Sequence, residues 1–480
     1  MTDKKYKLTI SILASNRRDT LPKTLKSIKP ILDNVSSELI VTDTGCDDEL
    51  LGVIKGYTDK LIEFAWCDDF AKARNVGLKQ AQGEWFMFLD DDEWFEDVKP
   101  IIEFFNSGEA DKYNVFHYIV RNYADMEGST YQDVVVERGI KLCEGVEFVD
   151  CIHEHFSHIK PPVRLLNCYV HHYGYAYKTD EDRKKHFMRN YPLLEQQIAK
   201  APYELRGYIH IISACNNALD YERSLEWTWK ALELVDKEYD KTDERNIRDI
   251  SSLYANVVHC EFFLDKLEAA VWHGEEYINL ALTELARCVI YSYLANSYLI
   301  IRQDEKALQR LREYFELYEY LDGKLELKMA QSVGVPAKAY TWTVLNRMWY
   351  FGMMKATEMQ NEEMVLYLMD KLRYLEKIQA LSSRKWQGNL IRLMIRSNRK
   401  ECYIDTVLRL MEEPVAATAM CEEILKTRDE DIGLFMEVVK YLVDNDSTSP
   451  YIRALRTIYF GLTGEVDKLR EINERISGQQ

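Results

Sequence analysis

Four acidic residues, Asp90, Asp91, Asp92 and Glu93, directly follow the apolar run of residues 85–89. Such a run is typical of a buried strand, and burying an unpaired carboxylate is costly. The four residues must therefore cap a helix, face solvent or bind a cation. In an Asp-x-Asp turn two carboxylates can converge on one Mn²⁺ or Mg²⁺ ion, because hard divalent cations prefer oxygen ligands. The same ion could also bind a diphosphate.

A helix cap is the simplest alternative for this cluster. The segment "EDVKPIIEFF" that follows predicts a helix, and acidic residues are favoured at helix N-termini. A cap needs one carboxylate, however, and four stand here. The spacing alone leaves the cap and the metal site equally open, so the neighbouring motifs must decide.

Short apolar runs alternate with helical stretches from residue 1 to about residue 90. The pattern runs through "KLTISILAS", "LPKTLKSIKPIL", "ELIVTD", "ELLGVIKGY", "LIEFAW", "FAKARNVGLKQA" and "EWFMFLD". It predicts a βαβαβαβ order and a mostly parallel sheet, whose ligands bind beyond the carboxyl ends of the strands. Polar residues stand at those ends: Ser15-Asn16-Arg17, Asp43, Asp68-Asp69 and the Asp90 cluster.

After residue 200 the pattern changes to long amphipathic helices with few Pro and Gly residues. "DYERSLEW", "DKLEAAVW" and "QDEKALQR" form a weak repeat whose small residues are Ser224, Ala269 and Ala307. The spacing is looser than the ~34 residues of tetratricopeptide repeats. We therefore expect an α/β domain over residues 1–195 and an irregular helical-repeat solenoid over residues 196–480. The tryptophans of the helical part are expected in its core.

Composition excludes several classes of function. The net charge of -17 disfavours binding to nucleic acid or anionic lipid, since both need a cationic surface. No segment approaches the ~18 apolar residues that a membrane helix needs. The ten cysteines show no C-x-x-C pair, and the N-terminus is interpreted as a strand without a signal sequence, so a cytoplasmic protein with reduced thiols is expected. The oligomeric state stays open, and a homo-oligomer is one option.

Taken together, the motifs of residues 6 to about 195 resemble those of the family-two glycosyltransferases of GT-A fold. In that family the loop after the first strand, here "TISILASNR", holds the nucleotide, which implies donor-binding roles for Ala14, Asn16 and Arg17. The acidic end of the second strand, here Asp43, lies near the base or ribose. The segment "DFAKARN" matches a D-F-S-x-A-R-N motif, with Ala71 in place of Ser, and adds Arg74 and Asn75 to the donor site.

The later motifs of the resemblance concern the metal and the reaction. "LDDDE" corresponds to L-D-A-D-E, which gives Asp90 and Asp92 the metal-binding roles and leaves Asp91 as a spacer in the donor site. In "ERGIKLCEGVEFVDCIHEHF", Arg138 and the "IHE" triplet match, whereas the second arginine of the motif is replaced around Cys143. "HHYGY" matches an H-x-G-Y segment and implies that His172 reaches the metal or the diphosphate.

Particular residues can be assigned chemical roles. Inverting transfer needs a base opposite the leaving group, and Glu154 is our candidate, with Glu93 and Asp150 as rivals. Alternatively, Glu154 only orients Arg138 or a loop. His172 is favoured over His171 as the metal ligand, because neighbours on a strand face opposite ways. His153 and His155 are expected to shape the acceptor pocket, and Arg74 and Arg138 to neutralise phosphate charge or form ion pairs.

The resemblance implies an inverting transfer of a sugar from a nucleoside diphosphate, most simply UDP, with Asp92 and Glu154 as catalytic residues. A GT-A domain followed by helical repeats is similar to the cysteine S-glycosyltransferases of antimicrobial glycopeptides, so a peptide or protein acceptor is expected. Two alternatives stay open. One is an acceptor that is a cell-envelope or lipid-linked saccharide. The other is a helical-repeat interaction protein whose front domain has lost its activity, which the intact acidic and histidine motifs argue against.

Overall fold

The computed structural model describes residues 5–477 except 124, 129–130, 175, 178, 339–341, 372–383, 398–400, 412–413 and 446–448. Two compact units make up the chain. The first contains residues 1–290 and 320–339, and the second contains residues 291–319 and 340–480. Tyr175 of the "HHYGY" segment lies outside the described residues.

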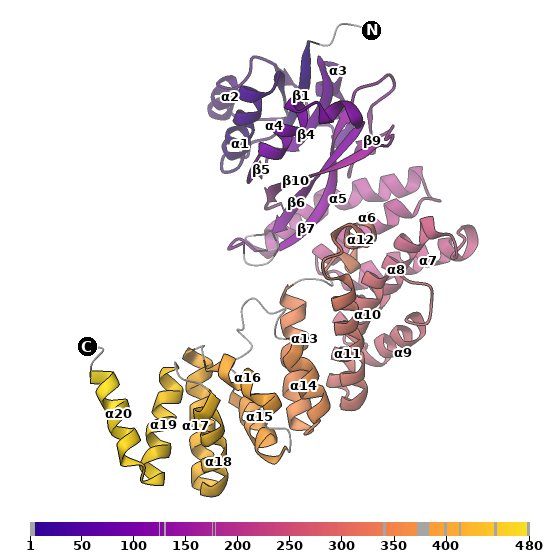
Figure 1. Ribbon diagram of the computed structural model, residues 1–480. Coiled ribbons are helices and arrows are strands. Elements are labelled where there is room, and N and C mark those ends of the chain that lie inside the picture. Colours follow the sequence, from indigo (N-terminus) through magenta and orange to yellow (C-terminus); the bar gives the residue numbers. More distant parts are fainter. Residues whose placement is uncertain are drawn as a thin grey trace. The chain divides into compact units, whose positions relative to one another are not determined.

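The first unit begins with a mixed sheet in the order β3-β2-β1-β4-β7-β6-β10-β5 (Figure 1). Its strands are β1 (Tyr6–Ala14), β2 (Ser37–Asp43), β3 (Leu61–Glu63), β4 (Gly83–Asp90), β5 (Glu93–Phe95), β6 (Val115–Tyr123), β7 (Tyr131–Lys141) and β10 (Val163–His172). The first four strands pair in parallel, as do β6 and β10, whereas β7 and β5 pair antiparallel. A small second sheet joins β8 (Phe148–Val149) to β9 (His155–Phe156).

Both faces of β4 are covered, which explains its uninterrupted apolar run. Trp85, Met87 and Leu89 belong to a core shared with α1 (Leu21–Asn34), α2 (Asp48–Lys55) and α4 (Lys99–Asn106). Phe86 and Phe88 pack on the opposite face, against α3 (Phe70–Lys79), β8 and β9. The βαβαβαβ order predicted for the first 90 residues is therefore confirmed, and the GT-A-like sheet brings the ends of β1, β2 and β4 to one edge.

The helix-cap interpretation of the acidic cluster is wrong. Helix α4 begins at Lys99, and its N-cap is Val98. Between the cluster and α4 the chain forms β5, in which Glu93 pairs with His172 of β10. The four acidic residues consequently stand at the junction of β4 and β5.

Helices make up the remainder of the secondary structure in the described residues, in agreement with the sequence-based prediction. After the short 3₁₀ helix η1 (Glu109–Lys112) of the sheet domain, the helices are α5 (Asp180–Lys200), α6 (Leu205–Asn217), α7 (Tyr221–Glu238), α8 (Glu244–Phe263), α9 (Leu267–Tyr277), α10 (Glu284–Ile300), α11 (Asp304–Leu321), α12 (Leu325–Gln331), η2 (Val335–Lys338), α13 (Trp342–Glu358), α14 (Glu362–Asp370), α15 (Arg384–Arg396), α16 (Glu401–Leu410), α17 (Pro414–Glu430), α18 (Ile432–Asn445), α19 (Pro450–Thr463) and α20 (Val466–Ser477).

Consecutive helices pack on one another within each unit, as expected of a helical-repeat solenoid. The series α5 to α9 does so in the first unit, and α17 to α20 in the second. Ser224 and Ala307 of the weak repeat are buried, but at the middle copy Ala270 is buried and Ala269 only partly, so the register differs by one residue there. The boundary predicted at residue 195 falls inside α5 and stays a prediction.

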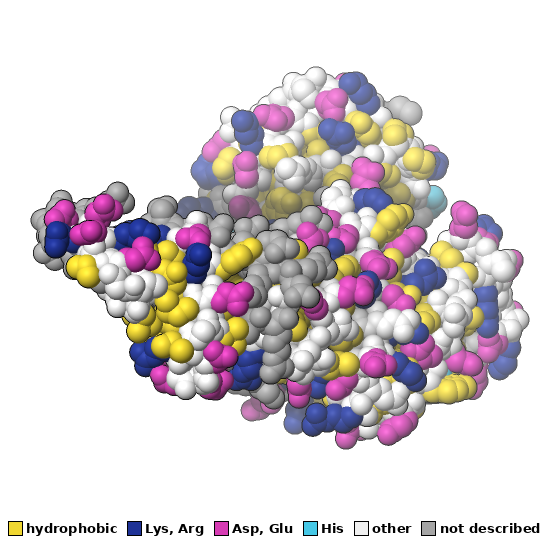
Figure 2. All heavy atoms as spheres, turned by 60° about the horizontal axis from the view of Figure 1, so that its bottom comes forward, with side chains coloured by type: hydrophobic (Ala, Val, Ile, Leu, Met, Phe, Trp, Pro, Cys, Tyr) yellow, Lys and Arg dark blue, Asp and Glu magenta, His cyan; other side chains and the backbone are white. Residues whose placement is uncertain are grey.

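The surface of the helical part differs from the prediction for its tryptophans. Trp229 and Trp272 are 37% and 59% exposed, so their expected place in the core is wrong. The side chain of Trp342 lies outside the described residues. On the face that Figure 2 shows, acidic and basic side chains are interspersed. In the described part of the chain, none of the helices has the length and apolar character to span a bilayer.

Candidate active site

The loop after β1 is tied to the acidic cluster through Asp91. One carboxylate oxygen of Asp91 accepts hydrogen bonds from the backbone N–H and the hydroxyl of Ser15, at 2.6 and 2.7 Å. The other lies 3.1 Å from Nε of Arg17. Burial raises the pKa of Asp91 to about 6, and the charge of Arg17 opposes this shift. Asp91, expected to be a spacer, thus holds the donor-binding loop predicted after β1.

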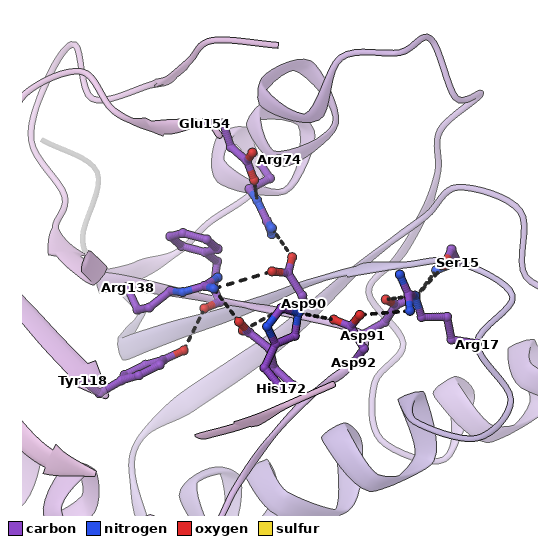
Figure 3. Close-up of polar contacts among 12 residues, drawn as sticks. Ser15, Arg17, Arg74, Asp90, Asp91, Asp92, Tyr118, Arg138, Glu154 and His172 are labelled. Carbon is purple, nitrogen blue, oxygen red and sulfur yellow. Dashed lines mark hydrogen bonds and ion pairs between the residues drawn. The ribbon is translucent and has the colours of Figure 1, made fainter. Parts of the chain in front are cut away.

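Asp90 lies between two buried arginines (Figure 3). It forms an ion pair with Arg74 of α3, and its second oxygen is 3.5 Å from Arg138 of β7. The two guanidinium groups lie over the ring of Phe88, at 4.4 and 4.6 Å from its centroid. Burial alone would raise the pKa of Asp90, but Arg74 and Arg138 outweigh it and lower the pKa, so Asp90 is ionised.

Asp92 meets a third arginine and the predicted histidine. One carboxylate oxygen of Asp92 is 2.9 Å from Nη1 of Arg17, and the other is 3.7 Å from Nε2 of His172. On its other side, Nδ1 of His172 lies 2.5 Å from the side-chain oxygen of Asn122. Because that oxygen accepts, Nδ1 carries the proton and Nε2 presents its lone pair toward Asp92. Burial lowers the pKa of His172, which favours the same neutral form.

Asp92 and His172 suit a divalent cation. Among the described residues, no three His, Cys, Asp or Glu side chains are grouped to hold a metal ion. A carboxylate and an imidazole lone pair that face each other repel, however, and a cation between them would relieve the repulsion. The contact of Nδ1 with Asn122 is the outer hydrogen bond that metal-binding histidines usually make. Asp90, by contrast, is held by two arginines.

Glu154 is joined to the acidic cluster through Arg74. Nε of Arg74 donates to Glu154, while Nη2 of the same side chain contacts Asp90. The partner of Glu154 is therefore Arg74. The alternative role considered from the sequence had paired Glu154 with Arg138. Both rivals for the base have other partners: Glu93 accepts from Arg138 at 2.5 Å and is 1% exposed, and Asp150 lies 3.6 Å from His155.

Four predicted donor-binding residues have contacts outside this network. Asp43 accepts from the backbone N–H groups of Gly45 and Cys46, at 2.9 and 2.7 Å, and so shapes the turn after β2. The carbonyl of Ala14 accepts from Thr44, the amide oxygen of Asn16 is 3.4 Å from the N–H of Asp47, and Asn75 is bonded to the backbone of Phe148. These contacts build the rim around the acidic cluster.

A small cavity lies beside the segment that carries Glu154. It has a volume of about 60 Å³, and its lining includes His153, Tyr177, His186 and His210. His153, one of the two histidines predicted to shape an acceptor pocket, lines it together with residues of α5 and α6. Sequence reasoning missed the residues from these helices, since nothing in the sequence pairs α6 with the "IHE" triplet. It also missed Asn122, which carries no motif.

Comparison with known proteins agrees with this geometry. Residues 9–156 match the model described as glycosyl transferase family 2. They form a domain of that family. The match runs from within β1 to the end of β9 and contains most of the residues described above, although it ends before His172.

Two curated proteins extend the comparison. The chain is 24% identical over 325 residues to the SPbeta prophage-derived glycosyltransferase SunS of Bacillus subtilis, covering 62% of this chain and 68% of that protein. This similarity reaches beyond the family 2 domain. Over 86 residues the chain is 35% identical to a TPR repeat-containing protein of Synechococcus elongatus, covering 18% and 20% of the two chains.

Among solved structures, residues 1–349 of TarS from S. aureus in complex with UDP-GlcNAc resemble the chain with a TM-score of 0.27 and 13% identity. That likeness covers 62% of this chain and 92% of the TarS chain.

Proposed function

We propose that this chain is an inverting, metal-dependent glycosyltransferase that moves a sugar from a UDP-sugar to a side chain of a peptide or protein. The observation that carries the proposal is the group of Asp90, Asp92 and His172 with Arg17 and Arg74 at the carboxyl ends of β1 and β4. Ligands of open α/β sheets bind at that edge. The family 2 domain supports sugar transfer from an activated donor.

Charge at this site suits a diphosphate. Arg17 has a side chain that is 44% exposed, so its guanidinium can turn from Asp91 and Asp92 toward an incoming phosphate. Arg74 and Arg138 are buried and hold Asp90 in place. Guanidinium groups bind phosphate oxygens in a bidentate manner, which favours this division of roles.

Asp92 and His172 would hold the metal ion, with Asp90 as a further candidate. A bound Mn²⁺ or Mg²⁺ would neutralise the charge that develops on the departing diphosphate. The chain's own part is to orient these two side chains: Asn122 orients His172, and Arg17 pairs with Asp92 until its guanidinium turns toward the phosphate. Both supports come from the sheet edge itself.

Glu154 is the proposed base. It would accept the acceptor's proton as the acceptor attacks the anomeric carbon in one displacement, which inverts configuration. Its contact with Arg74 holds the carboxylate close to Asp90, because the same arginine side chain contacts both. The cavity next to His153 supports an approach of the acceptor from the side of α5 and α6.

A family 2 domain followed by helical repeats, the arrangement of the cysteine S-glycosyltransferases that the sequence resembles, favours a peptide or protein acceptor. A cell-envelope saccharide or a lipid-linked acceptor is the alternative. Light scattering would show whether the chain forms a homo-oligomer. An inactive scaffold is disfavoured because the ion pairs of Asp90, Asp92 and Glu154 are intact.

The full-length chain can test the proposal directly. Calorimetry with UDP and Mn²⁺ should show binding, and a panel of UDP- and GDP-sugars should reveal one donor that is hydrolysed with Mn²⁺ and not with EDTA. Asp92→Asn should lose this activity, whereas Asp33→Asn, which changes an exposed carboxylate on α1, should keep it. Full turnover in EDTA would contradict the proposed metal dependence. Hydrolysis of GDP-sugars alone would contradict UDP as the nucleotide of the donor.

The acceptor atom and the stereochemistry of transfer can be determined once the active donor is known. With that donor, synthetic peptides containing a single Cys, Ser or Asn should identify the acceptor atom. The anomeric coupling constant of the product, measured by NMR, should show inversion. Retention would contradict the single displacement, and transfer only to saccharides would replace the peptide acceptor.

A further inference from the structure

The segment that carries Glu154 has an unusual backbone. Asp150 and His153 adopt left-handed conformations, with φ values of 72° and 54°. Residues with a Cβ atom rarely adopt this region, although Asp and His do so more readily than most. Contacts from neighbouring elements can stabilise such a backbone.

Helix α6 provides the contacts to both left-handed residues. Nη2 of Arg206 donates to the carbonyl of His153 at 3.0 Å, and Nε of Arg206 lies 3.7 Å from the carboxylate of Asp150. The ring of His210, one helical turn further on, lies 4.2 Å from the ring of His153, centroid to centroid. Two side chains of one helix thus fix the two strained positions.

The residues between these positions are held as well. The carbonyl of Cys151 accepts from the backbone N–H of Phe70, at the start of α3, at 2.9 Å. The thiol of Cys151 lies 3.7 Å from the carbonyl of Leu193 in α5. The segment is consequently enclosed between α3, α5 and α6, all within the first compact unit.

Glu154 is the last residue of this segment and reaches into the site. Its carboxylate meets Arg74, which in turn meets Asp90, as Figure 3 shows. A change of backbone at His153 would therefore rotate Glu154 away from Arg74. Errors of about 1 Å in the position of a reacting group can lower a rate by about 10²-fold.

We propose that Arg206 and His210 of α6 are positioning residues that set the location of Glu154, so that the helical part of the chain completes the catalytic site. The proposal rests on the proposed function, with Glu154 as the base. Arg206 and His210 act only through the segment of residues 150–154, and the donor and metal residues lie on other elements. Loss of Arg206 or His210 should therefore lower turnover and leave donor binding unchanged.

The test uses the full-length chain and the UDP-sugar that the wild type hydrolyses. For each variant, kcat, KM for the donor, the Kd for UDP and the urea midpoint are measured. Arg206→Ala and His210→Ala should lower kcat about 10- to 100-fold, with the Kd for UDP unchanged within twofold. His210→Phe keeps an aromatic ring against His153 and should recover most of the rate.

Two further comparisons separate positioning from general stability. Arg245→Ala removes an exposed arginine of α8 that pairs with Asp243, and it should leave kcat unchanged. In a Glu154→Gln background, Arg206→Ala should cause little further loss, since both changes act through the same side chain. Arg206→Lys keeps the charge but cannot make both contacts, so an intermediate rate is expected. This variant replaces Arg206→Ala in the test if the alanine variant does not fold.

Several results would overturn the proposal. They are unchanged kcat in Arg206→Ala and His210→Ala, an equal further loss in the Glu154→Gln background, or a parallel rise in the Kd for UDP. A wild type that binds UDP and hydrolyses a UDP-sugar, combined with one of these results, would refute the positioning role alone. A wild type without UDP binding would refute the proposed function and the positioning role together.

Discussion

Gly174 leaves no room for a side chain beside His172. A Cβ atom at this position would lie 2.3 Å from Nε2 of His172, closer than any real contact. Nε2 is the atom that faces Asp92 at 3.7 Å. The glycine of the H-x-G-Y segment therefore has a steric reason in this chain: it allows the imidazole to lie against the acidic cluster.

Gly174→Ala is expected to displace the ring of His172 and thereby impair metal-dependent activity. Since the obstructing atom belongs to a side chain that can turn away, the fold should survive the change. Hydrolysis of the UDP-sugar should fall about 10- to 100-fold, and the Mn²⁺ concentration for half-maximal rate should rise. Gly52→Ala is the control, because a Cβ on Gly52 meets nothing within 4 Å. Equal Mn²⁺ dependence in both variants would show that His172 does not bind the metal.

Glu154→Gln tests the base with the smallest change of shape. The amide keeps the size of the side chain, and Arg74 keeps its contact with Asp90, so UDP should still bind. The rate of transfer should fall by about 10² to 10⁴, the usual contribution of a positioned base. An acceptor thiol would reduce this loss, because a cysteine is partly ionised near neutral pH. A normal rate would transfer the assignment to Glu93 or Asp150.

At this scale the sequence indicates residue types better than their partners. The motifs brought Asp90, Asp92, Arg74 and Glu154 to attention. The structure joins Asp90, Arg74 and Glu154 in one chain of ion pairs and places Asp92 in a separate pair with Arg17. That Arg74 would bridge Asp90 and Glu154 was not predictable, because the partners lie 16 and 80 residues away along the chain. The burial of Asp92 was also unforeseen, since its position after a strand suggested a solvent edge.

Among the elements, the parallel half of the sheet could be predicted and the antiparallel half could not. Strands β1 to β4 alternate with helices, and this local pattern is visible in the sequence. β5 has only three residues, and its partner β10 begins some 70 residues later. β7 inserts between β4 and β6 through pairings that no local periodicity encodes. Strand pairing over such distances depends on tertiary packing.

The packing of α6 against the segment of residues 150–154 should make the first unit sensitive to acid. Burial lowers the pKa of His210 well below its usual value, with further contributions from His153 and Arg206. The unfolded chain binds a proton near pH ~6.5, whereas folded His210 stays neutral. Stability from this group is therefore fully present above that pH and decreases as the pH falls below it.

His210→Phe isolates this effect. The urea midpoint of the wild type should decrease between pH 7.5 and pH 5, and the decrease should be smaller in His210→Phe, which cannot be protonated. Other titratable groups, including His153 and His155, are present in both chains, as is the fixed charge of Arg206, so their contributions cancel in the difference. Parallel curves for the two chains would show that His210 titrates normally in the folded state.

For the whole molecule, the two compact units do not coincide with the boundary expected near residue 195. The first unit contains the sheet together with α5 to α9, as well as residues 320–339. Composition marked the change from strands to helices correctly, but it could not show that the first helices pack with the sheet. The contacts of Arg206 and His210 with His153 are examples of this packing between α6 and the sheet domain.

A fragment of residues 1–195 separates donor binding from positioning of the base. It keeps Arg17, Asp92 and His172, which come from the sheet, but lacks all of α6 and ends within α5. Provided that circular dichroism shows a folded fragment, calorimetry should detect UDP binding close to that of the full chain. Hydrolysis of the UDP-sugar should be slower, since Arg206 and His210 no longer hold His153. A folded fragment without UDP binding would place part of the donor site in the helices, and a fragment with the full rate of hydrolysis would remove any catalytic role from α6.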